Sequence, residues 1–325
     1  MTIMFWLAPE VWTALLVILL PPCLFYVFYP AISMKWQDDV GVDVEVVSPE
    51  TTIQSGDADV LFSFVIPAYN EEERLPKMLD ATLAFLKENR GKLITHCQQR
   101  TNNSKATVVE WIIVSDGSTD KTDSVVREYA KTSKDVWKLL TLHQNSGKGY
   151  AVKQGMLKAS GAMRLMVDAD GATDMKGLLL LLEEEHEHYI VFGSRAQNEL
   201  LNPIQRTMIR SILMHVFHFF VHVLCSSRVK DTQCGFKLFT AQAANDLFSP
   251  LHLKRWAFDI ELVIVAQQLN YDIKEVSVTW EEVEGSKLDT SKMHLALASL
   301  GMLRDMICVR LCYELGIWKT KNGKK

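Results

Sequence analysis

Continuously apolar runs alternate with amphipathic segments between residues 60 and 200. The runs VLFSFVIP, VVEWIIV, WKLLTLHQ, RLMV and YIVFG each have the length of a β-strand and are followed by polar or Gly-containing stretches. Strands that are apolar throughout are typical of parallel sheets whose two faces are both covered by helices. We therefore predict an α/β fold with a mostly parallel sheet and helices on both faces.

Segments between these runs carry apolar residues at helical spacing. Asp120 directly precedes the segment KTDSVVREYAKT, and its side chain can cap that predicted helix. Residues 91–107 are predicted to hold the end of the first helix and a loop. The helical segments are LPKMLDATLAFLKEN, KTDSVVREYAKT, the Gly-punctuated NSGKGYAVKQGMLKAS and GLLLLLEEEHE.

Residues 11–34 contain no charged side chain, and a bilayer span needs about 20 apolar residues. Aromatic residues lie near both ends of this segment, and no basic segment or cleavage site marks a removed signal peptide. We predict a single transmembrane anchor after a short segment 1–10, followed by a polar linker, residues 35–59. The alternative is a buried or interfacial segment. Lys35 directly after the span favours a cytosolic position for the rest of the chain.

The second half of the chain differs from residues 60–200. The pattern of residues 205–225 predicts a long helix with few charges, inside a unit predicted at 201–289. We predict an interfacial helix here rather than a span, because the segments on both sides must reach one site. Residues 290–325 are predicted to be a second interfacial helix with a lysine-rich tail that suits an anionic membrane surface.

The composition excludes some classes of function. In 325 residues, 48% hydrophobic side chains supply an ample core for one large domain or two small ones. The net charge of −4 gives no basic field, so no nucleic-acid partner is expected. Six scattered cysteines without a CxxC pair indicate buried thiols rather than a disulfide scaffold.

Polar residues follow the predicted strands where each strand ends. The carboxyl ends of parallel strands meet at one edge of the sheet, and open α/β sheets bind ligands there. The strand ends therefore locate a site. They carry Tyr69, Asn70 and Glu71; Ser115, Asp116 and Gly117; Asp168, Ala169 and Asp170; and Gly193, Ser194 and Arg195.

Asp168 and Asp170 stand one residue apart at the end of an apolar strand and are followed by a glycine. They resemble the DXD motif of glycosyltransferases, where a divalent cation neutralises the diphosphate of a sugar nucleotide. Mg²⁺ and Mn²⁺ prefer oxygen ligands and keep phosphates and water in their shell, so two carboxylates suffice. We predict a Mg²⁺ or Mn²⁺ site at this pair. The alternative is a surface turn, with Asp174 as a nearby cap.

Asp116 heads the sequence SDGSTD and is predicted to accept the N3–H of uracil. The alternative is a turn residue that accepts local amide hydrogen bonds. Lys148, between two glycines at a helix start, favours phosphate, although a surface loop would need no such role. The residues predicted to bind the nucleotide are Pro67, Tyr69, Asn70, Glu71, Asp116, Gly117, Ser118, Gly147, Lys148, Asp168 and Ala169.

Four motifs together resemble glycosyltransferase family 2, whose members have the GT-A fold: FVIPAYNEEERLP, VSDGSTD, NSGKGYAVKQG and DADGATD. The segments VKDTQCGFKLF, RWAFDIEL and VEGSKL, with the single N-terminal anchor, narrow the resemblance to members that glucosylate dolichyl phosphate. The likeness runs from about Phe62 to the C-terminal helix. It implies a nucleotide-sugar-binding half at 60–200 and an acceptor-side half at 201–289.

The resemblance also implies a reaction. UDP-glucose and dolichyl phosphate would give dolichyl β-D-glucosyl phosphate and UDP on the cytosolic face of the endoplasmic reticulum membrane. The product would be the glucose donor for lipid-linked oligosaccharide assembly in N-glycosylation. Asp231 is expected to orient the acceptor or act as a base, in a catalytic group with Asp168, Asp170 and Arg195. The residues expected to meet the acceptor phosphate are Arg195, Arg206, Arg210, Lys237 and Arg255.

Two departures from related patterns stand out. Ala172 occupies the position of a glutamine metal ligand in related mannosyltransferases, so water or Thr173 would replace it. Residues 252–256 read HLKRW rather than the QxxRW of processive members, which disfavours a polymer synthase. Asp259 either acts near the acceptor or pairs with Arg255. The alternatives are another donor, GDP-mannose or UDP-N-acetylglucosamine, and a non-catalytic membrane scaffold of the same fold.

Overall fold

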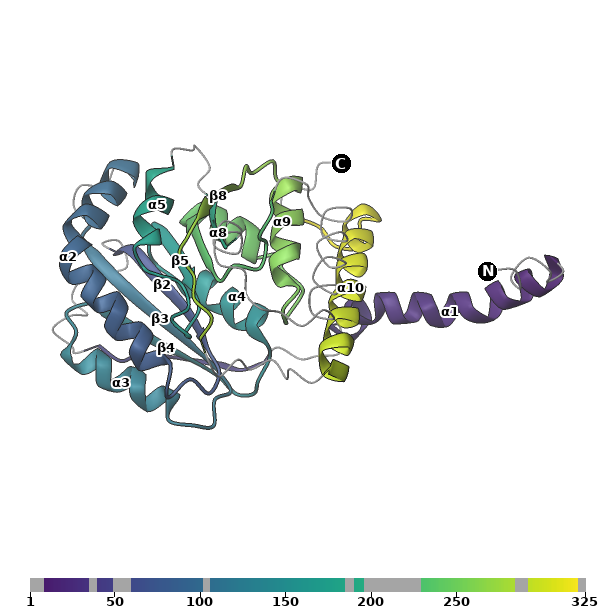
Figure 1. Ribbon diagram of the computed structural model, residues 1–325, viewed down its shortest axis with the longest axis horizontal. Coiled ribbons are helices and arrows are strands. Elements are labelled where there is room, and N and C mark those ends of the chain that lie inside the picture. Colours follow the sequence, from purple (N-terminus) through teal and green to yellow (C-terminus); the bar gives the residue numbers. More distant parts are fainter. Residues whose placement is uncertain are drawn as a thin grey trace.

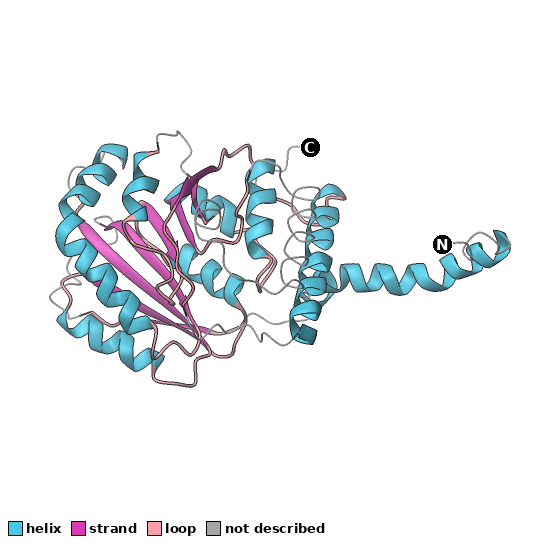
Figure 2. Cartoon of the chain, viewed as in Figure 1, coloured by secondary structure: helices cyan, strands magenta, loops and turns pink. Residues whose placement is uncertain are grey.

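The computed structural model describes residues 9–34, 40–48, 60–101, 106–184, 190–195, 229–283 and 292–320. Its body is an eight-stranded sheet with helices on both faces, and a long N-terminal helix extends away from it (Figures 1 and 2). The strands lie in the order β1-β4-β3-β2-β5-β7-β6-β8. They are β1 (Val42–Val46), β2 (Val60–Ala68), β3 (Val108–Asp116), β4 (Val136–Leu142), β5 (Met163–Val167), β6 (Ile190–Ser194), β7 (Phe236–Thr240) and β8 (Lys274–Ser277).

The five strands predicted from the apolar runs are confirmed as β2 to β6. Strands β2, β3, β4 and β5 run parallel. The chain moves outward from β2 through β3 to β4 and then returns to the other side of β2 at β5. A topological switch point therefore lies between β2 and β5, and open α/β sheets bind ligands at such points.

The side chains of β2 alternate between two cores, one on each face of the sheet. Phe62 and Phe64 pack in the core that α2, α3 and α5 cover, and Val65 packs in the core that α4, α8, α9 and α10 cover. This explains the continuously apolar sequence of the strand, because both faces are buried. The helices are α1 (Pro9–Met34), α2 (Leu75–Thr101), α3 (Thr122–Thr132), α4 (Lys148–Lys158), α5 (Gly177–Glu183), α8 (Ala241–Phe248), α9 (Phe258–Gln268) and α10 (Lys292–Glu314).

The second half of the chain completes the same sheet. Strand β7 lies between β5 and β6 and is antiparallel to both, and β8 pairs in parallel with β6. The sequence pattern predicted neither β7 nor β8. The sheet is therefore mixed, but it is mostly parallel as predicted, because only β1 and β7 run against the other strands. The predicted halves 60–200 and 201–289 share it.

Two segments predicted to be irregular have regular structure. Residues Val42–Val46, inside the predicted linker, form the edge strand β1, which pairs antiparallel with β4. Their alternation of valine with acidic residues fits an edge strand with one more exposed face. Helix α2 continues to Thr101, beyond its predicted end, because Leu93 and Cys97 extend its buried face at helical spacing.

Helix α1 packs against α10, which lies between α1 and the body of the protein (Figure 1). Among the residues whose side chains the structure describes, no helix is long and apolar enough to cross a membrane. The helix predicted at 205–225, with Arg206 and Arg210, falls outside the described residues.

Candidate active site

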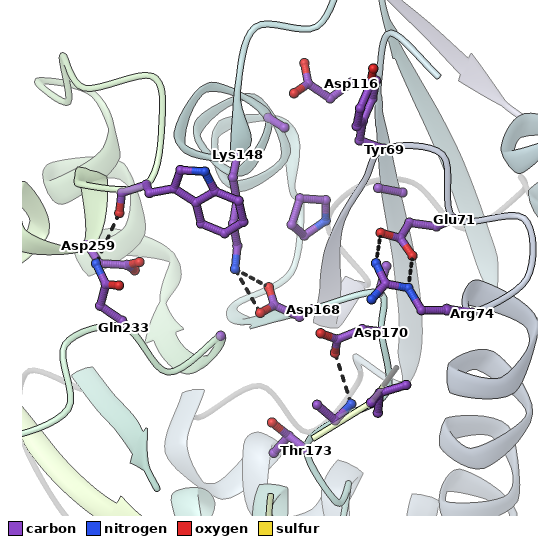
Figure 3. A pocket seen from close by; sticks show the side chains of 18 of the residues that line it. Tyr69, Glu71, Arg74, Asp116, Lys148, Asp168, Asp170, Thr173, Gln233 and Asp259 are labelled. Atoms are coloured by element: carbon purple, nitrogen blue, oxygen red, sulfur yellow. Dashed lines mark hydrogen bonds and ion pairs between the residues drawn. The ribbon is translucent and has the colours of Figure 1, made fainter. Parts of the chain in front are cut away.

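A cavity of about 510 Å³ opens where β2, β3, β5 and β6 end, beside the switch point (Figure 3). Residues that are far apart in the sequence meet there, as the strand-end pattern predicted. The predicted site residues that line it are Pro67, Tyr69, Glu71, Asp116, Lys148, Asp168, Ala169, Asp170, Arg195 and Arg255.

Asp168 lies directly after β5 and is paired with Lys148, the first residue of α4. The Lys148 ammonium is 2.6 Å from Oδ1 and 2.8 Å from Oδ2 of Asp168 (Figure 3). Burial alone would lower the pKa of Lys148, but the neighbouring carboxylates, Asp168 first among them, raise it above its ordinary value. Lys148 is therefore a charged ammonium, and it lies with Asp168 at the centre of the cavity (Figure 3).

Gly235 makes room for the Asp168 carboxylate. A Cβ atom at Gly235, just before β7, would lie 1.9 Å from Oδ2 of Asp168. The backbone N–H of Asp168 also donates to the Gly235 carbonyl at 3.2 Å. The close approach of the Asp168 carboxylate to the backbone requires a glycine at this position.

Asp116 holds the loop that precedes α4. Its two carboxylate oxygens accept the backbone N–H groups of Ser146 at 2.7 Å and of Gly147 at 2.8 Å. Burial raises the pKa of Asp116, and these two hydrogen bonds oppose the rise. The carboxylate thus binds backbone amides, although the loop is some 30 residues away in sequence. Its contact with a uracil base stays a prediction.

The loops after β2 and β3 are joined by side-chain hydrogen bonds. Asn70, at a left-handed φ of 53°, accepts the Thr119 N–H at 2.8 Å and donates its own N–H to Ser118 at 3.2 Å. Gly117 has φ 68°, and a Cβ there would lie 2.5 Å from the Asn145 nitrogen. Asn70, Gly117 and Ser118 do not line the cavity. In the structure they hold two loops together beside the site.

Glu71 lines the cavity, but its carboxylate is engaged by a residue that was not predicted. Arg74 donates Nε to Oε2 of Glu71 at 2.7 Å, and its Nη2 contacts Oε1 (Figure 3). Arg74 also lines the cavity. The three-residue spacing was the available signal, because the turn that leads into α2 brings residues three apart onto one side.

Arg195 follows β6 and is oriented by Asp231. Asp231 accepts three hydrogen bonds of 2.8 Å, one from the backbone N–H of Arg195 and two from its guanidinium. Burial would raise the pKa of Asp231, but these contacts hold it below its ordinary value. The guanidinium also lies 5.5 Å from the centre of the Trp280 ring. Asp231 is a weak base in this setting, and Arg195 presents a fixed positive charge to the cavity.

Lys237 does not reach the cavity, which corrects its predicted contact with the acceptor phosphate. It is fully buried in β7 and donates to Oδ1 of Asp259 at 2.8 Å. A buried ammonium needs an anion beside it. Asp259 lines the cavity, and burial raises its pKa against the opposing charge of Lys237. Of the two alternatives for Asp259, the pairing with Arg255 is replaced by a pairing with Lys237.

The chemistry of Asp168 and Asp170 fits a divalent cation. Oδ1 of Asp168 is buried and has no hydrogen-bond partner in the described part of the chain, although it forms the ion pair with Lys148. Asp170 uses one oxygen to accept the Ala172 N–H at 3.0 Å. Within the described ranges, no third acidic, His or Cys side chain joins them as a metal-binding group. A cation held here would complete its shell with substrate oxygens and water.

Several cavity residues were not predicted to bind substrate. Trp256 follows Arg255 in the segment HLKRW, and the Lys148 ammonium lies 5.5 Å from its ring centre. Trp280 comes from the strand-like segment after β8, where no motif marks it. The further lining residues outside the prediction include Arg74, Asn145, Gln233, Trp256, Trp280 and Glu282.

A mixed sheet covered by helices, with paired aspartates at the end of a strand beside its switch point, defines a glycosyltransferase of the GT-A class. Residues 63–248 match the family described as glycosyl transferase family 2, and the chain belongs to that family. The resemblance predicted from the motifs is confirmed.

The chain is similar to curated enzymes over most of its length. It is 42% identical over 273 residues to a dolichyl-phosphate beta-glucosyltransferase of Dictyostelium discoideum, with 81% of this chain and 78% of the relative covered. It is 40% identical to the enzyme of that name from Homo sapiens, with 81% and 79% covered. A crystal structure of glucosyl-3-phosphoglycerate synthase from Mycobacterium tuberculosis with UDP shares the fold, with a TM-score of 0.52 at 16% identity and 78% and 81% of the chains covered.

Proposed function

We propose that this enzyme transfers glucose from UDP-glucose to dolichyl phosphate and releases UDP. The observation that carries the proposal is the 42% identity over 81% of the chain to a dolichyl-phosphate beta-glucosyltransferase. The cavity supports it, because Asp168 and Asp170 line the same cavity as Arg195 and Arg255. The donor diphosphate needs the cation that the aspartates would hold, and the acceptor phosphate needs the arginines.

On the donor side, Asp168 and Asp170 would hold Mg²⁺ or Mn²⁺. When bound, the cation supplies charge neutralisation for the diphosphate leaving group. Lys148 adds a second positive charge at the start of α4, where the backbone amides also favour phosphate. Tyr69 and Pro67, which line the cavity beside Asp116, are the proposed contacts of the base and ribose.

The chemical step is a single in-line displacement. An oxygen of dolichyl phosphate forms a bond to the anomeric carbon of glucose, and the bond from that carbon to the UDP oxygen breaks, which inverts the configuration. The second pKa of a phosphate monoester is about 6, so the nucleophile is largely deprotonated at neutral pH. A strong general base is not needed, which agrees with the lowered pKa of Asp231.

On the acceptor side, Arg195 and Arg255 are the described cations that we propose bind the lipid phosphate. Both line the cavity, and Asp231 fixes Arg195 by a bidentate contact that leaves little freedom to the guanidinium. Arg206 and Arg210 remain proposed partners of the same phosphate. Trp256 and Trp280 present apolar rings at the cavity, where a polyprenyl chain would leave the phosphate.

We propose that the enzyme is anchored in the endoplasmic reticulum membrane by residues 11–34, with the catalytic body in the cytosol. The 24 uncharged residues of this segment support the anchor. Apolar side chains exposed on α1, on α10 and just after α10 support contact of this end of the molecule with lipid. They include Leu20, Leu24, Phe25, Ile32, Leu297, Leu300, Leu315 and Ile317.

The decisive experiment measures transfer from radiolabelled UDP-glucose to dolichyl phosphate by the purified full chain with Mg²⁺ or Mn²⁺. We expect a labelled glycolipid, less of it when a chelator is added, and none with D168N. Preferential transfer from GDP-mannose or UDP-N-acetylglucosamine in competition would replace the donor assignment. Full complementation of a cell that lacks the activity by D168N would support a scaffold instead.

The sequon at Asn102–Ser104 tests the orientation. It lies in the proposed cytosolic body and should stay without glycan in the native protein, because N-glycosylation takes place in the lumen. A glycan on Asn102, removable by an endoglycosidase, would place the body on the lumenal side.

A further inference from the structure

The Lys148 ammonium engages the Asp168 carboxylate that a metal would use. It contacts both carboxylate oxygens, at 2.6 and 2.8 Å. Figure 3 shows this contact at the centre of the cavity, with Asp170 on the far side of Asp168 from Lys148. An ammonium and a divalent cation repel each other strongly at such short range in a partly buried site. They therefore compete for the same carboxylate.

The position of Lys148 is fixed by its backbone. Gly147 has φ 99°, and a Cβ there would lie 2.5 Å from the Lys254 carbonyl. A Cβ at Gly149 would lie 2.6 Å from the Leu253 carbonyl. The N–H of Tyr150 donates to the Lys254 carbonyl at 3.0 Å. The two glycines thus let the start of α4 press against the segment that ends in Trp256, so the ammonium is aimed at Asp168.

A second carboxylate can receive the ammonium when it leaves Asp168. Asp259 lines the same cavity, and the charge of Lys148 opposes the rise of its pKa, so the two groups are close enough to interact. The diphosphate of a bound donor would offer a stronger partner, because it brings more negative charge into the cavity. The donor diphosphate is therefore the partner expected to shift the ammonium away from Asp168, with Asp259 as a second carboxylate beside it.

We propose that Lys148 is an internal cation that keeps Asp168 occupied until the donor arrives, so that the metal binds together with the nucleotide and not before it. This inference rests on the proposed metal and nucleotide sites. The diphosphate draws the ammonium away from Asp168 and frees both oxygens for the divalent cation. Because such coupling is reciprocal, nucleotide raises the affinity for metal by the same factor as metal raises the affinity for nucleotide.

The test measures Mn²⁺ binding to the purified full chain by electron paramagnetic resonance, with and without UDP. Without UDP, K148M should bind Mn²⁺ about tenfold more tightly than the wild type, because no ammonium competes. With UDP, the gain in Mn²⁺ affinity should be large in the wild type and several-fold smaller in K148M. If Lys148 only binds phosphate, the result should differ: K148M should bind Mn²⁺ no more tightly without UDP, and its only defect should be weaker UDP binding.

Two variants control the measurement. K158M makes the same substitution in the last turn of α4, on an exposed side chain, and should leave Mn²⁺ binding unchanged. K148R keeps a cation at the site and should keep nucleotide-free binding weak. Unchanged or weaker Mn²⁺ binding by folded K148M without UDP would overturn the proposed role of Lys148 but leave the proposed donor site intact. Absence of Mn²⁺ binding by the wild type even with UDP would overturn the proposed donor site as well.

Discussion

Glu261 is a fully buried carboxylate that connects the C-terminal helix to the cavity wall. It belongs to α9 and accepts the backbone N–H of His252 at 2.9 Å and of Leu253 at 2.7 Å. It also accepts the Tyr313 hydroxyl of α10 at 3.0 Å. The segment that Glu261 holds continues directly into Arg255 and Trp256, so we predict that it positions the acceptor side of the site.

The loss of unfolding free energy in a Glu261 variant depends on how many hydrogen-bond donors are left without an acceptor. In E261A, the backbone N–H groups of His252 and Leu253 lose their acceptor and the His252 ring loses its contact at 3.0 Å, while the Tyr313 hydroxyl keeps the Pro250 carbonyl at 3.4 Å. Each unsatisfied buried donor costs about 1–3 kcal/mol. Removal of a desolvated carboxylate offsets part of this cost. We expect E261A to lower the free energy of unfolding by about 3–5 kcal/mol, the range for breaking a buried charged contact. E261Q keeps one acceptor oxygen and should lose about 1–3 kcal/mol.

The variant Y313F tests the positioning of the acceptor side with little effect on the free energy of unfolding. It removes one hydrogen bond to a charged acceptor, worth about 1.5 kcal/mol, and leaves the backbone donors bound. We expect the KM for dolichyl phosphate to rise several-fold while the KM for UDP-glucose changes little. Y271F is the matched control, because its hydroxyl also donates to a carboxylate, Asp246, at 2.8 Å, away from the cavity residues.

The assays are chemical denaturation of the full chain in detergent and transfer kinetics with each substrate varied. A loss of less than about 1 kcal/mol in E261A would refute the reasoning about stranded donors. Equal changes of both KM values in Y313F, or the same change in Y271F, would refute the positioning role.

Three further outcomes follow from the geometry. G235A should abolish transfer and Mn²⁺ binding while the chain stays folded by circular dichroism, because its Cβ would enter the Asp168 carboxylate. The pKa of Asp231 is lowered in the folded state, so its carboxylate stabilises the fold fully above the unfolded pKa of about 3.9. This contribution disappears as the pH falls toward the folded pKa. The melting temperature of D231N should therefore fall less than that of the wild type when the pH is lowered. K237M should cost about 3–5 kcal/mol in denaturation, because Asp259 is left as an unpaired buried charge, and adding D259N should recover part of the loss.

The sequence predicted the parallel strands and the location of the site because both depend on local patterns. A strand buried on both faces must be apolar throughout, so β2, β3 and β5 stand out. The polar residues that follow these strands, such as Asp168, then lie at one edge of the sheet, independent of how the helices pack. The edge strands gave weaker signals: β8 has four half-buried residues, and β1 has an acidic residue at every second position.

The errors concern residues whose role depends on a partner distant in the sequence. Lys237 was assigned to the phosphate because its charge suits an anion. Which face of β7 it occupies depends on register, and the register places it against Asp259, 22 residues later. Asp231 and Arg195 are 36 residues apart, so their bidentate contact could not be inferred from spacing. A charged residue in a motif can serve the substrate or another charge, and only packing decides between them.

The segment from Asp231 to Lys237 connects the two sides of the reaction. Asp231 orients Arg195 on the acceptor side, Gly235 touches Asp168 on the donor side, and Lys237 holds Asp259 at the cavity wall. These contacts come from one short stretch because β7 lies between β5, which leads to Asp168, and β6, which leads to Arg195. A shift of β7 by one residue would turn Lys237 to the other face of the sheet and would displace Gly235, which directly precedes the strand, from Asp168. The antiparallel insertion of β7 is therefore what keeps the donor carboxylates and the acceptor arginine at a fixed distance.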